Sequence, residues 1–223
     1  MTTTDQPAVD PLTLGHAFFD LARERLDMVV PAALTDPEQP ATRGDIDLDP
    51  DLWTAAGVIP ARPAAVLIGI VDRPEPGIIL TQRTTSLPSH AGQIAFPGGK
   101  IDPGDATPLD AALREAEEEV GLDRGLVDPI GYLDLYCTFS GFRILPVVSR
   151  VAPGYTLTLN QAEVEDAFEV PLAFLMDKQN HALHSREWKG LRRRFYVMPY
   201  QERYIWGVTA GILRNLYERI YEK

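Results

Sequence analysis

Hydrophobic residues along the chain fall into short runs that predict strands. Ala64–Val71 is an unbroken apolar run between prolines, and such runs are typical of strands buried on both faces. Gly77 leads directly into a second apolar run, Ile78–Thr81, so we expect these two strands to form a hairpin. Similar patterns predict strands at Ile94–Phe96, Val127–Tyr136 and Arg143–Val151, and a polar hairpin at His181–Pro199.

Other segments have the apolar spacing of helices. Thr107–Val120 is the clearest, and we also expect helices at Leu14–Met28 and Tyr204–Tyr221. Ala162–Leu175 has a mixed pattern, in which Pro171 begins a short helix. Because strands and helices are interleaved, the chain belongs to the α/β or α+β class. We expect residues 1–60 to form a helical extension with a loop, and residues 61–223 to form one domain.

Charge and composition narrow the range of partners. The 223 residues include 21 Lys and Arg against 32 Asp and Glu, a net charge of −11. This charge argues against binding to long nucleic acids or to anionic membranes, since both need a basic surface. A single cysteine, Cys137, no apolar run of membrane-spanning length and no signal peptide predict a cytoplasmic protein. The sequence leaves open whether the chain is a monomer or a homodimer.

One acidic loop resembles a calcium site only superficially. Asp45–Asp49 has carboxylates at alternate positions, as the start of an EF-hand loop does. Such a loop would need Gly at position 50 and Glu at position 56, where this chain has Pro50 and Ala56. We therefore interpret the segment as a solvated acidic loop.

The helix predicted at Thr107–Val120 carries most of the candidate chemistry. Thr107 is a good N-cap with Asp110 three residues later, and Gly121 is a typical C-terminal stop. At about 100° per residue, three carboxylates fall on one edge beside the apolar stripe: Glu115, Glu118 and Glu119. Most runs of Glu are solvated faces of a helix. Glu115 and Glu119, which lie four residues apart, nevertheless repel each other unless a cation lies nearby. Carboxylate oxygens suit Mg²⁺ or Mn²⁺.

A glycine pair precedes this helix. Gly98 and Gly99 follow the short strand Ile94–Phe96, and Lys100 comes next. Glycines at such a point let the backbone approach a ligand, and exposed amides near a helix N-terminus favour an anion. The loop is therefore a candidate binding site for a phosphate group.

Together the loop and the helix resemble a known motif. Residues 99–122 resemble the Nudix box, G-x5-E-x7-R-E-U-x-E-E-x-G-U, in which U is a bulky apolar residue. The residues that match are Gly99, Arg114, Glu115, Glu118, Glu119, Gly121 and Leu122. The chain departs from the box at Asp105 in place of Glu, at Ala116 in place of the first U, and by one extra residue between Asp105 and Arg114.

The resemblance implies a fold and an activity. We expect a mixed β-sheet sandwiched between helices, and hydrolysis of a pyrophosphate bond in a small nucleoside diphosphate derivative. It implies Mg²⁺ or Mn²⁺ held by Glu115, Glu118 and Glu119, with the carbonyl of Gly98 as a further ligand. Arg114 would orient the glutamates. The general base would be a box glutamate or one from a later segment, Glu163 or Glu165, although either of these two is as readily interpreted as part of a solvated loop.

The segment before the box resembles the signature of coenzyme A pyrophosphatases. The similar stretches are Leu80–Thr84 and Gly92–Gly99, but Pro88 stands where the signature has a second arginine. Coenzyme A or an acyl derivative is therefore the leading substrate. The alternatives are ADP-ribose, an oxidised nucleoside triphosphate, or a binding protein of this fold that has lost catalysis.

Three further residues are candidates for contact with substrate. Arg83 could reach a phosphate or a carboxylate at a strand edge. His90 in the loop before the box could touch substrate or bond to its own backbone, and Arg143 could form part of the substrate wall. The basic cluster Arg192–Arg194 is better interpreted as the exterior of a hairpin. We expect Cys137 to be buried packing, because no second Cys or evident His partner accompanies it.

Overall fold

The computed structural model describes residues 11–39, 43–50, 61–188 and 191–222, and parts of the predicted extension (1–10, 40–42 and 51–60) lie outside these ranges. The helices are α1 (Pro11–Arg25), α3 (Pro108–Val120), α4 (Leu172–Leu175) and α5 (Val208–Tyr217), which continues as a π-helical turn, η5 (Glu218–Glu222). The 3₁₀ turns are η1 (Ala32–Leu34), η2 (Asp45–Asp47), η3 (Arg124–Leu126) and η4 (Lys178–Asn180). The strands are β1 (Arg43–Gly44), β2 (Arg62–Val71), β3 (Gly77–Arg83), β4 (Ile94–Ala95), β5 (Gly98–Lys100), β6 (Val127–Tyr132), β7 (Tyr136–Cys137), β8 (Phe142–Val151), β9 (Val164–Pro171), β10 (Ala182–Trp188), β11 (Leu191–Tyr200) and β12 (Arg203–Trp206).

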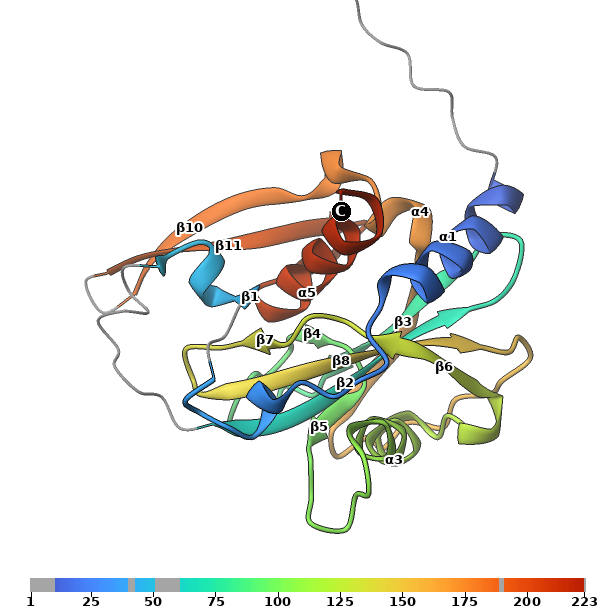
Figure 1. Cartoon of the computed structure of the whole chain (residues 1–223), viewed down its shortest axis with the longest axis horizontal. Helices are drawn as coiled ribbons and strands as arrows, with labels where there is room; N and C mark the ends of the chain where they lie inside the picture. The colour runs from blue at the N-terminus through green and yellow to red at the C-terminus, as the bar shows by residue number, and fades with distance from the viewer. Residues whose placement is uncertain (1–10, 40–42, 51–60, 189–190, 223) are drawn as a thin grey trace, which may run out of the picture.

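Within the described residues the strands form two sheets. The larger has nine strands with the central order β1-β7-β8-β2-β3-β4, and it is mixed, because β2 lies parallel to β8 and antiparallel to β3. The smaller sheet is β10-β11-β12 and contains the predicted polar hairpin. Helix α3 covers one face of the large sheet, and α1 and α5 lie on the other side (Figure 1). The predicted mixed sheet between helices is therefore confirmed.

Two cores explain the unbroken apolar character of β2. Leu67 and Ile79 pack with Ala112, Ala116 and the rest of the apolar stripe of α3. Alternate residues on the opposite face of the sheet pack instead with α1 and α5, and these include Ile68, Ile70, Ile78 and Leu80. Because both faces of the sheet are covered, neither could carry polar residues without burying them.

Several predicted elements differ from those in the structure. In the segment with a mixed pattern, Ala162–Leu175, most residues form strand β9, which pairs along β3, whereas the short helix predicted at Pro171 is confirmed as α4. The predicted C-terminal helix begins only at Val208, because Arg203–Trp206 is strand β12. The acidic loop is not simply solvated, since the carboxylate of Asp45 accepts hydrogen bonds from the hydroxyl of Tyr136 at 3.1 Å and the N–H of Phe139 at 2.9 Å.

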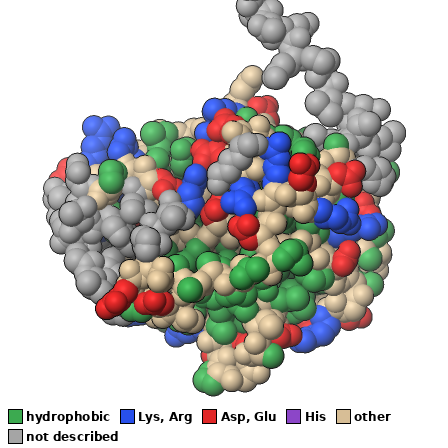
Figure 2. Space-filling view, viewed as in Figure 1, with side chains coloured by type: hydrophobic (Ala, Val, Ile, Leu, Met, Phe, Trp, Pro, Cys, Tyr) green, Lys and Arg blue, Asp and Glu red, His purple; other side chains and the backbone are tan. Residues whose placement is uncertain are grey.

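One face of the molecule is broadly hydrophobic. Figure 2 shows hydrophobic side chains gathered over η1 and the neighbouring strands of the large sheet, with acidic and basic side chains interspersed above them. A shallow pocket lies in this region, lined by residues 27–33 and 132–135. None of the helix carboxylates of the site described next lines this pocket.

Candidate active site

Strands β2 and β3 diverge, and the segment that crosses between them carries the glycine pair. The predicted hairpin is paired only at Ile70 with Ile78 and at Val71 with Gly77. Beyond that point β4 pairs with β3, while β5 pairs with β2 at Ala64–Val66. The chain from Ile94 to Lys100 therefore passes from one strand to the other at the open end of the hairpin, directly beneath α3.

Gly98 is required where the chain crosses, and Gly99 lets the chain pass close to the Glu115 side chain. Gly98 has a φ of 151°, and a Cβ there would lie 2.5 Å from the carbonyl oxygen of Ala65. A Cβ on Gly99 would lie 2.5 Å from the carboxyl carbon of Glu115. Such distances are far inside van der Waals contact, so the glycines let the backbone pass close to β2 and to the carboxylate.

Helix α3 begins and ends where the sequence predicts. The hydroxyl of Thr107 accepts a hydrogen bond from the N–H of Asp110 at 3.1 Å, and Gly121 is the left-handed C-cap. The side chain of Asp110 also bonds to the cap, because its carboxylate accepts a hydrogen bond of 2.7 Å from the same hydroxyl. These caps fix the register of the helix relative to the crossing segment.

Glu119 is the buried carboxylate of the site, and its side chain is almost fully enclosed. Its Oε2 accepts a hydrogen bond from the N–H of Gly98 at 3.2 Å, and its Oε1 lies 3.6 Å from the guanidinium of Arg83. Burial raises the pKa of Glu119 to about 7, although the Gly98 N–H and Arg83 both act to lower it. A pKa raised this far by burial and near neighbours is typical of functional sites.

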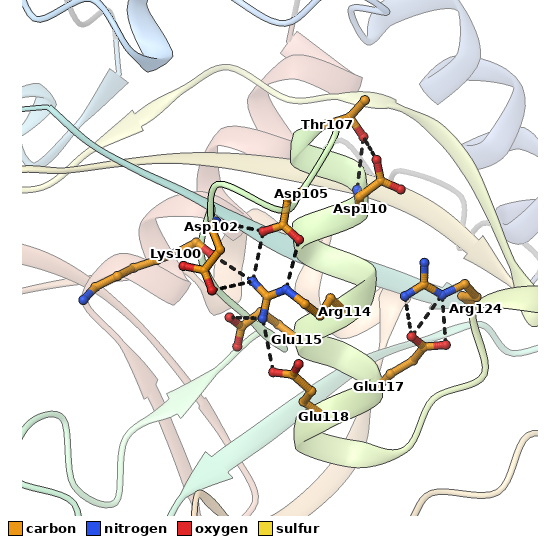
Figure 3. A network of polar contacts seen from close by, with 10 residues as sticks. All are labelled: Lys100, Asp102, Asp105, Thr107, Asp110, Arg114, Glu115, Glu117, Glu118 and Arg124. Atoms are coloured by element: carbon orange, nitrogen blue, oxygen red, sulfur yellow. Dashed lines mark hydrogen bonds and ion pairs between the residues drawn. The ribbon is translucent and has the colours of Figure 1, made fainter.

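Arg114 forms hydrogen bonds both to the loop before α3 and to two glutamates of the helix (Figure 3). Its guanidinium donates two hydrogen bonds of 3.0 Å to Asp105 and one of 3.2 Å to the carbonyl oxygen of Lys100. Its Nη1 donates to Glu115 at 2.9 Å and to Glu118 at 3.1 Å. The hydrogen bonds from Arg114 lower the pKa of Asp105, and those to Asp105 raise the pKa of Arg114. Arg114 therefore contacts both Glu115 and Glu118, and its role in orienting them stays a prediction.

The three helix carboxylates differ in exposure. The side chain of Glu115 is 18% exposed and that of Glu118 is 57% exposed, while Glu119 is buried. Burial also raises the pKa of Glu115, against the effect of Arg114. Among the residues that the structure describes, no three His, Cys, Asp or Glu side chains lie close enough together to hold a metal ion. Glu118 is the side chain with most freedom to move, because its ion pair with Arg114 is exposed and such pairs are weak.

Comparisons with known proteins identify the family. The profile of the NUDIX domain matches residues 60–191, more than half of the chain. The chain belongs to the Nudix family. It is 43% identical over 162 residues to the Uncharacterized Nudix hydrolase NudL of Cronobacter sakazakii, covering 73% of this chain and 84% of that protein. The protein of the same name in Escherichia coli K12 is 43% identical over 155 residues, 70% of this chain and 81% of that protein.

Solved structures give the same family name at lower identity. A MutT/nudix family protein from Enterococcus faecalis is 14% identical and covers 77% of this chain and 68% of that chain, with a TM-score of 0.47. Nudix hydrolases generally cut pyrophosphate bonds in small molecules and generally use divalent metal ions such as Mg²⁺ or Mn²⁺. Along the parts of the chain that the structure describes, no helix is both long and apolar enough to cross a membrane.

The structure gives a role to the departure of this chain from the Nudix box at Asp105. In the structure, Asp105 accepts both parallel bonds from Arg114, and its Oδ2 also accepts a bond from the N–H of Asp102 at 2.8 Å. The extra residue of the loop comes after Asp105, so the shorter acid and the longer loop together still bring the carboxylate to Arg114. The acidic residue in the sequence indicates this pairing, because a carboxylate can accept two parallel hydrogen bonds from the planar guanidinium of an arginine.

The two later glutamates are placed differently. Glu163 precedes β9 in a turn whose Asn160 N–H donates to the carbonyl oxygen of Glu119, and the charge of Glu163 acts to raise the pKa of both Glu115 and Glu119. Glu165, two residues further on, is exposed on β9. The turn therefore attaches the backbone of Glu163 to the end of the box helix, and the role of either glutamate as a base stays a prediction.

Other predicted substrate contacts are engaged elsewhere or exposed. Arg143 is buried, and its guanidinium donates to the backbone carbonyls of a neighbouring segment, namely those of Ala33, Asp36, Pro37 and Gln39. His90 is exposed and its Nδ1 lies 2.9 Å from Oε1 of Gln93. The side chain of Lys100 extends away from the Arg114 cluster (Figure 3). Cys137 is buried as predicted, and burial raises its pKa to about 11.

Replacing Arg114 with Met should lower the free energy of unfolding by about 2 kcal/mol, because Asp105, Glu115 and Glu118 lose their shared cation. The matched control is Arg124→Met, which breaks one exposed ion pair with Glu117 on the same helix and should have little effect. Urea unfolding of both variants at neutral pH, with metal chelated, measures the difference. Equal losses in the two variants would contradict the central role of Arg114.

Proposed function

We propose that this chain hydrolyses the pyrophosphate bond of coenzyme A or an acyl-coenzyme A in a reaction that depends on Mg²⁺ or Mn²⁺. One observation supports the substrate more than any other. The segment that resembles the coenzyme A signature runs from β3 to Gly99, and residues near both of its ends, Arg83 and Gly98, contact Glu119. The loop between them, residues 84–93, therefore begins and ends beside the box carboxylates, where it can select the substrate.

The donor set is suited to a hard divalent cation. Glu119 is a buried carboxylate whose charge its neighbours only partly offset, and the bare Cα of Gly99 leaves room beside the carboxylate of Glu115. Glu115, Glu118 and Glu119, with the carbonyl of Gly98, would hold the ion, and oxygen donors of this kind suit Mg²⁺ or Mn²⁺. When bound, such a cation offsets the negative charge of the phosphates.

The remaining tasks fall to side chains around the helix. Arg114 orients Glu115 and Glu118 through its hydrogen bonds. The side chain of Arg83 is 26% exposed beside Glu119, so its guanidinium is our candidate to bind a phosphate oxygen. Glu163, on the turn that is bonded to the carbonyl oxygen of Glu119, is our candidate to accept the proton of the attacking water.

A substrate panel tests this proposal. We expect turnover of coenzyme A to a 3′-phosphorylated adenosine monophosphate half and a phosphopantetheine half, with Mg²⁺ or Mn²⁺ present and none after chelation. ADP-ribose and an oxidised nucleoside triphosphate complete the panel. Preference for either of these would keep the chemistry and change the substrate. No turnover of any member with either metal would favour a binding protein.

The substitution Pro88→Arg should raise kcat/KM for coenzyme A by about tenfold, because an arginine in the loop offers a charged hydrogen bond to a substrate phosphate. Pro88 is exposed in the loop 84–93, so the change should leave the fold intact. Ser89→Arg adds the same charge at the next exposed position and is the matched control. An equal rise in both variants would show a general effect of charge, and no rise in Pro88→Arg would count against a phosphate contact at this position.

A further inference from the structure

Asn160 connects the end of the helix that carries the Nudix box to the turn that carries Glu163. Its backbone N–H donates to the carbonyl oxygen of Glu119 at 2.9 Å, in the last turn of α3. Its own carbonyl oxygen accepts from the N–H groups of Glu163 and Val164, both at 2.9 Å. The last carbonyl oxygens of a helix lack partners within it, so the bond that the Glu119 carbonyl accepts from Asn160 attaches the turn to the helix.

The side chain of Asn160 adds a bond at each of its two polar ends. Its Oδ1 accepts from the N–H of Ala162 at 3.3 Å, and its Nδ2 donates to Oε1 of Glu163 at 3.3 Å. A backbone N–H can only donate and an ionised carboxylate can only accept, so these partners determine which end of the amide is which. Asp has no donor for Glu163, and Ser is too short to reach both partners.

The same turn is also bonded to the end of strand β3. The N–H of Thr84 donates to the carbonyl oxygen of Glu163 at 3.0 Å, and Thr84 directly follows Arg83. The backbone of Glu163 is therefore attached both to α3 near Glu119 and to β3 beside the arginine that contacts Glu119. With its backbone held at two points, the remaining freedom of Glu163 is in its side chain, where Asn160 bonds.

We propose that Asn160 is a positioning residue of the hydrolytic site, which holds the carboxylate of Glu163 in place on the turn that is bonded to the end of α3. This inference rests on the proposed function. In the step that it serves, Glu163 takes one proton from water while the water oxygen bonds to phosphorus. The bridging P–O bond breaks, its electron pair leaves with the departing phosphate, and the second water proton stays on the new phosphate group.

The test is Asn160→Asp, which keeps the acceptor for the Ala162 N–H and replaces the donor to Glu163 with a repelling oxygen. We expect kcat to fall by about 10- to 100-fold, since small displacements of a reacting group have effects of this size. KM should change by less than about twofold, because the substrate contacts are untouched. Gln161→Glu adds the same charge at the next, exposed position and should retain wild-type kcat. Wild-type kcat in Asn160→Asp would overturn the proposal.

A double-mutant cycle separates positioning from simple support of the fold. If Asn160 acts through Glu163, then Asn160→Asp in the Glu163→Gln background should cause no further loss of kcat. Losses that multiply would show that Asn160 acts independently and would overturn the proposal. Asn160→Ser, which keeps an acceptor for the turn, serves in place of Asn160→Asp if that variant does not fold, and should show the same dependence on Glu163.

Failure of this inference is distinguishable from failure of the proposed function. Absence of turnover in the wild-type chain with every substrate of the panel would reject the proposed function. Turnover in the wild type with normal kcat in both Asn160 variants would reject only the role of Asn160. Normal kcat in Glu163→Gln would likewise reject the inference while leaving pyrophosphate hydrolysis in place.

Discussion

Glu119→Gln should lower kcat at saturating Mg²⁺ by at least about 100-fold while leaving the fold intact. Glutamine has nearly the same shape and keeps an oxygen that can accept the hydrogen bond from the Gly98 N–H, now at 3.2 Å. What it removes is the negative charge at the inner edge of the cluster, where it would hold the metal ion. The measurement is steady-state hydrolysis of the best panel substrate, with circular dichroism to verify folding.

Glu117→Gln is the matched control for that prediction. It makes the same chemical change on the same helix, but Glu117 faces outward and pairs with Arg124 at 2.5 Å. Its turnover should stay close to that of the wild type. If Glu119→Gln retained near-normal turnover under these conditions, Glu119 would not be part of the hydrolytic machinery.

The helix and its carboxylates could be predicted because their signals are local. The caps Thr107 and Gly121 lie next to the residues that they cap, and 3.6-residue periodicity alone puts Glu115 and Glu119 on one edge. The glycine pair was also readable, since two glycines at a strand end indicate a close approach of backbone. What they approach, the carbonyl of Ala65 and the carboxylate of Glu115, depends on the pairing of distant strands.

Features that depend on long-range pairing were missed. Nothing near Ala162–Leu175 in the sequence shows that it pairs with β3, so its half-buried alternation looked mixed. Ile205 has helical spacing with the residues after it, yet it lies on β12 opposite Met198. Arg143 was a candidate for the substrate wall, because the sequence does not show that it binds carbonyls of residues more than a hundred positions earlier.

The choice between Glu163 and Glu165 shows the same limit at the site itself. Both are acidic, two residues apart, and equally plausible as bases from sequence. The turn that Asn160 forms is bonded to the carbonyl oxygen of Glu119 and so holds the backbone of Glu163 near the end of α3, whereas Glu165 is exposed on the strand that follows. The discriminating contact joins the helix end to a turn some forty residues later, and no local pattern encodes it.

Without metal, Glu119 should make the protein less stable as pH rises, which is the opposite of the usual effect of a carboxylate. Its pKa is raised from 4.5 to about 7, so between these values the folded state binds more protons than the unfolded state and stability falls with increasing pH. Glu119→Gln removes this cost. The chelated variant should therefore match the wild type near pH 4 and exceed its free energy of unfolding by about 3 kcal/mol at pH 8.

Glu117 supplies a control of opposite sign for this pH dependence. Its hydrogen bonds from Arg124 lower its pKa, so its ionised form stabilises the fold above its ordinary pKa, and this contribution is lost as pH falls through the lowered value. Glu117→Gln should thus be slightly less stable than the wild type at pH 8 and equal to it in acid. Urea unfolding at several pH values measures both variants. A Glu119→Gln variant less stable than the wild type at pH 8 would mean that burial does not dominate at Glu119, and adding Mg²⁺ should narrow the gap because the ion binds the wild-type carboxylate in the folded state.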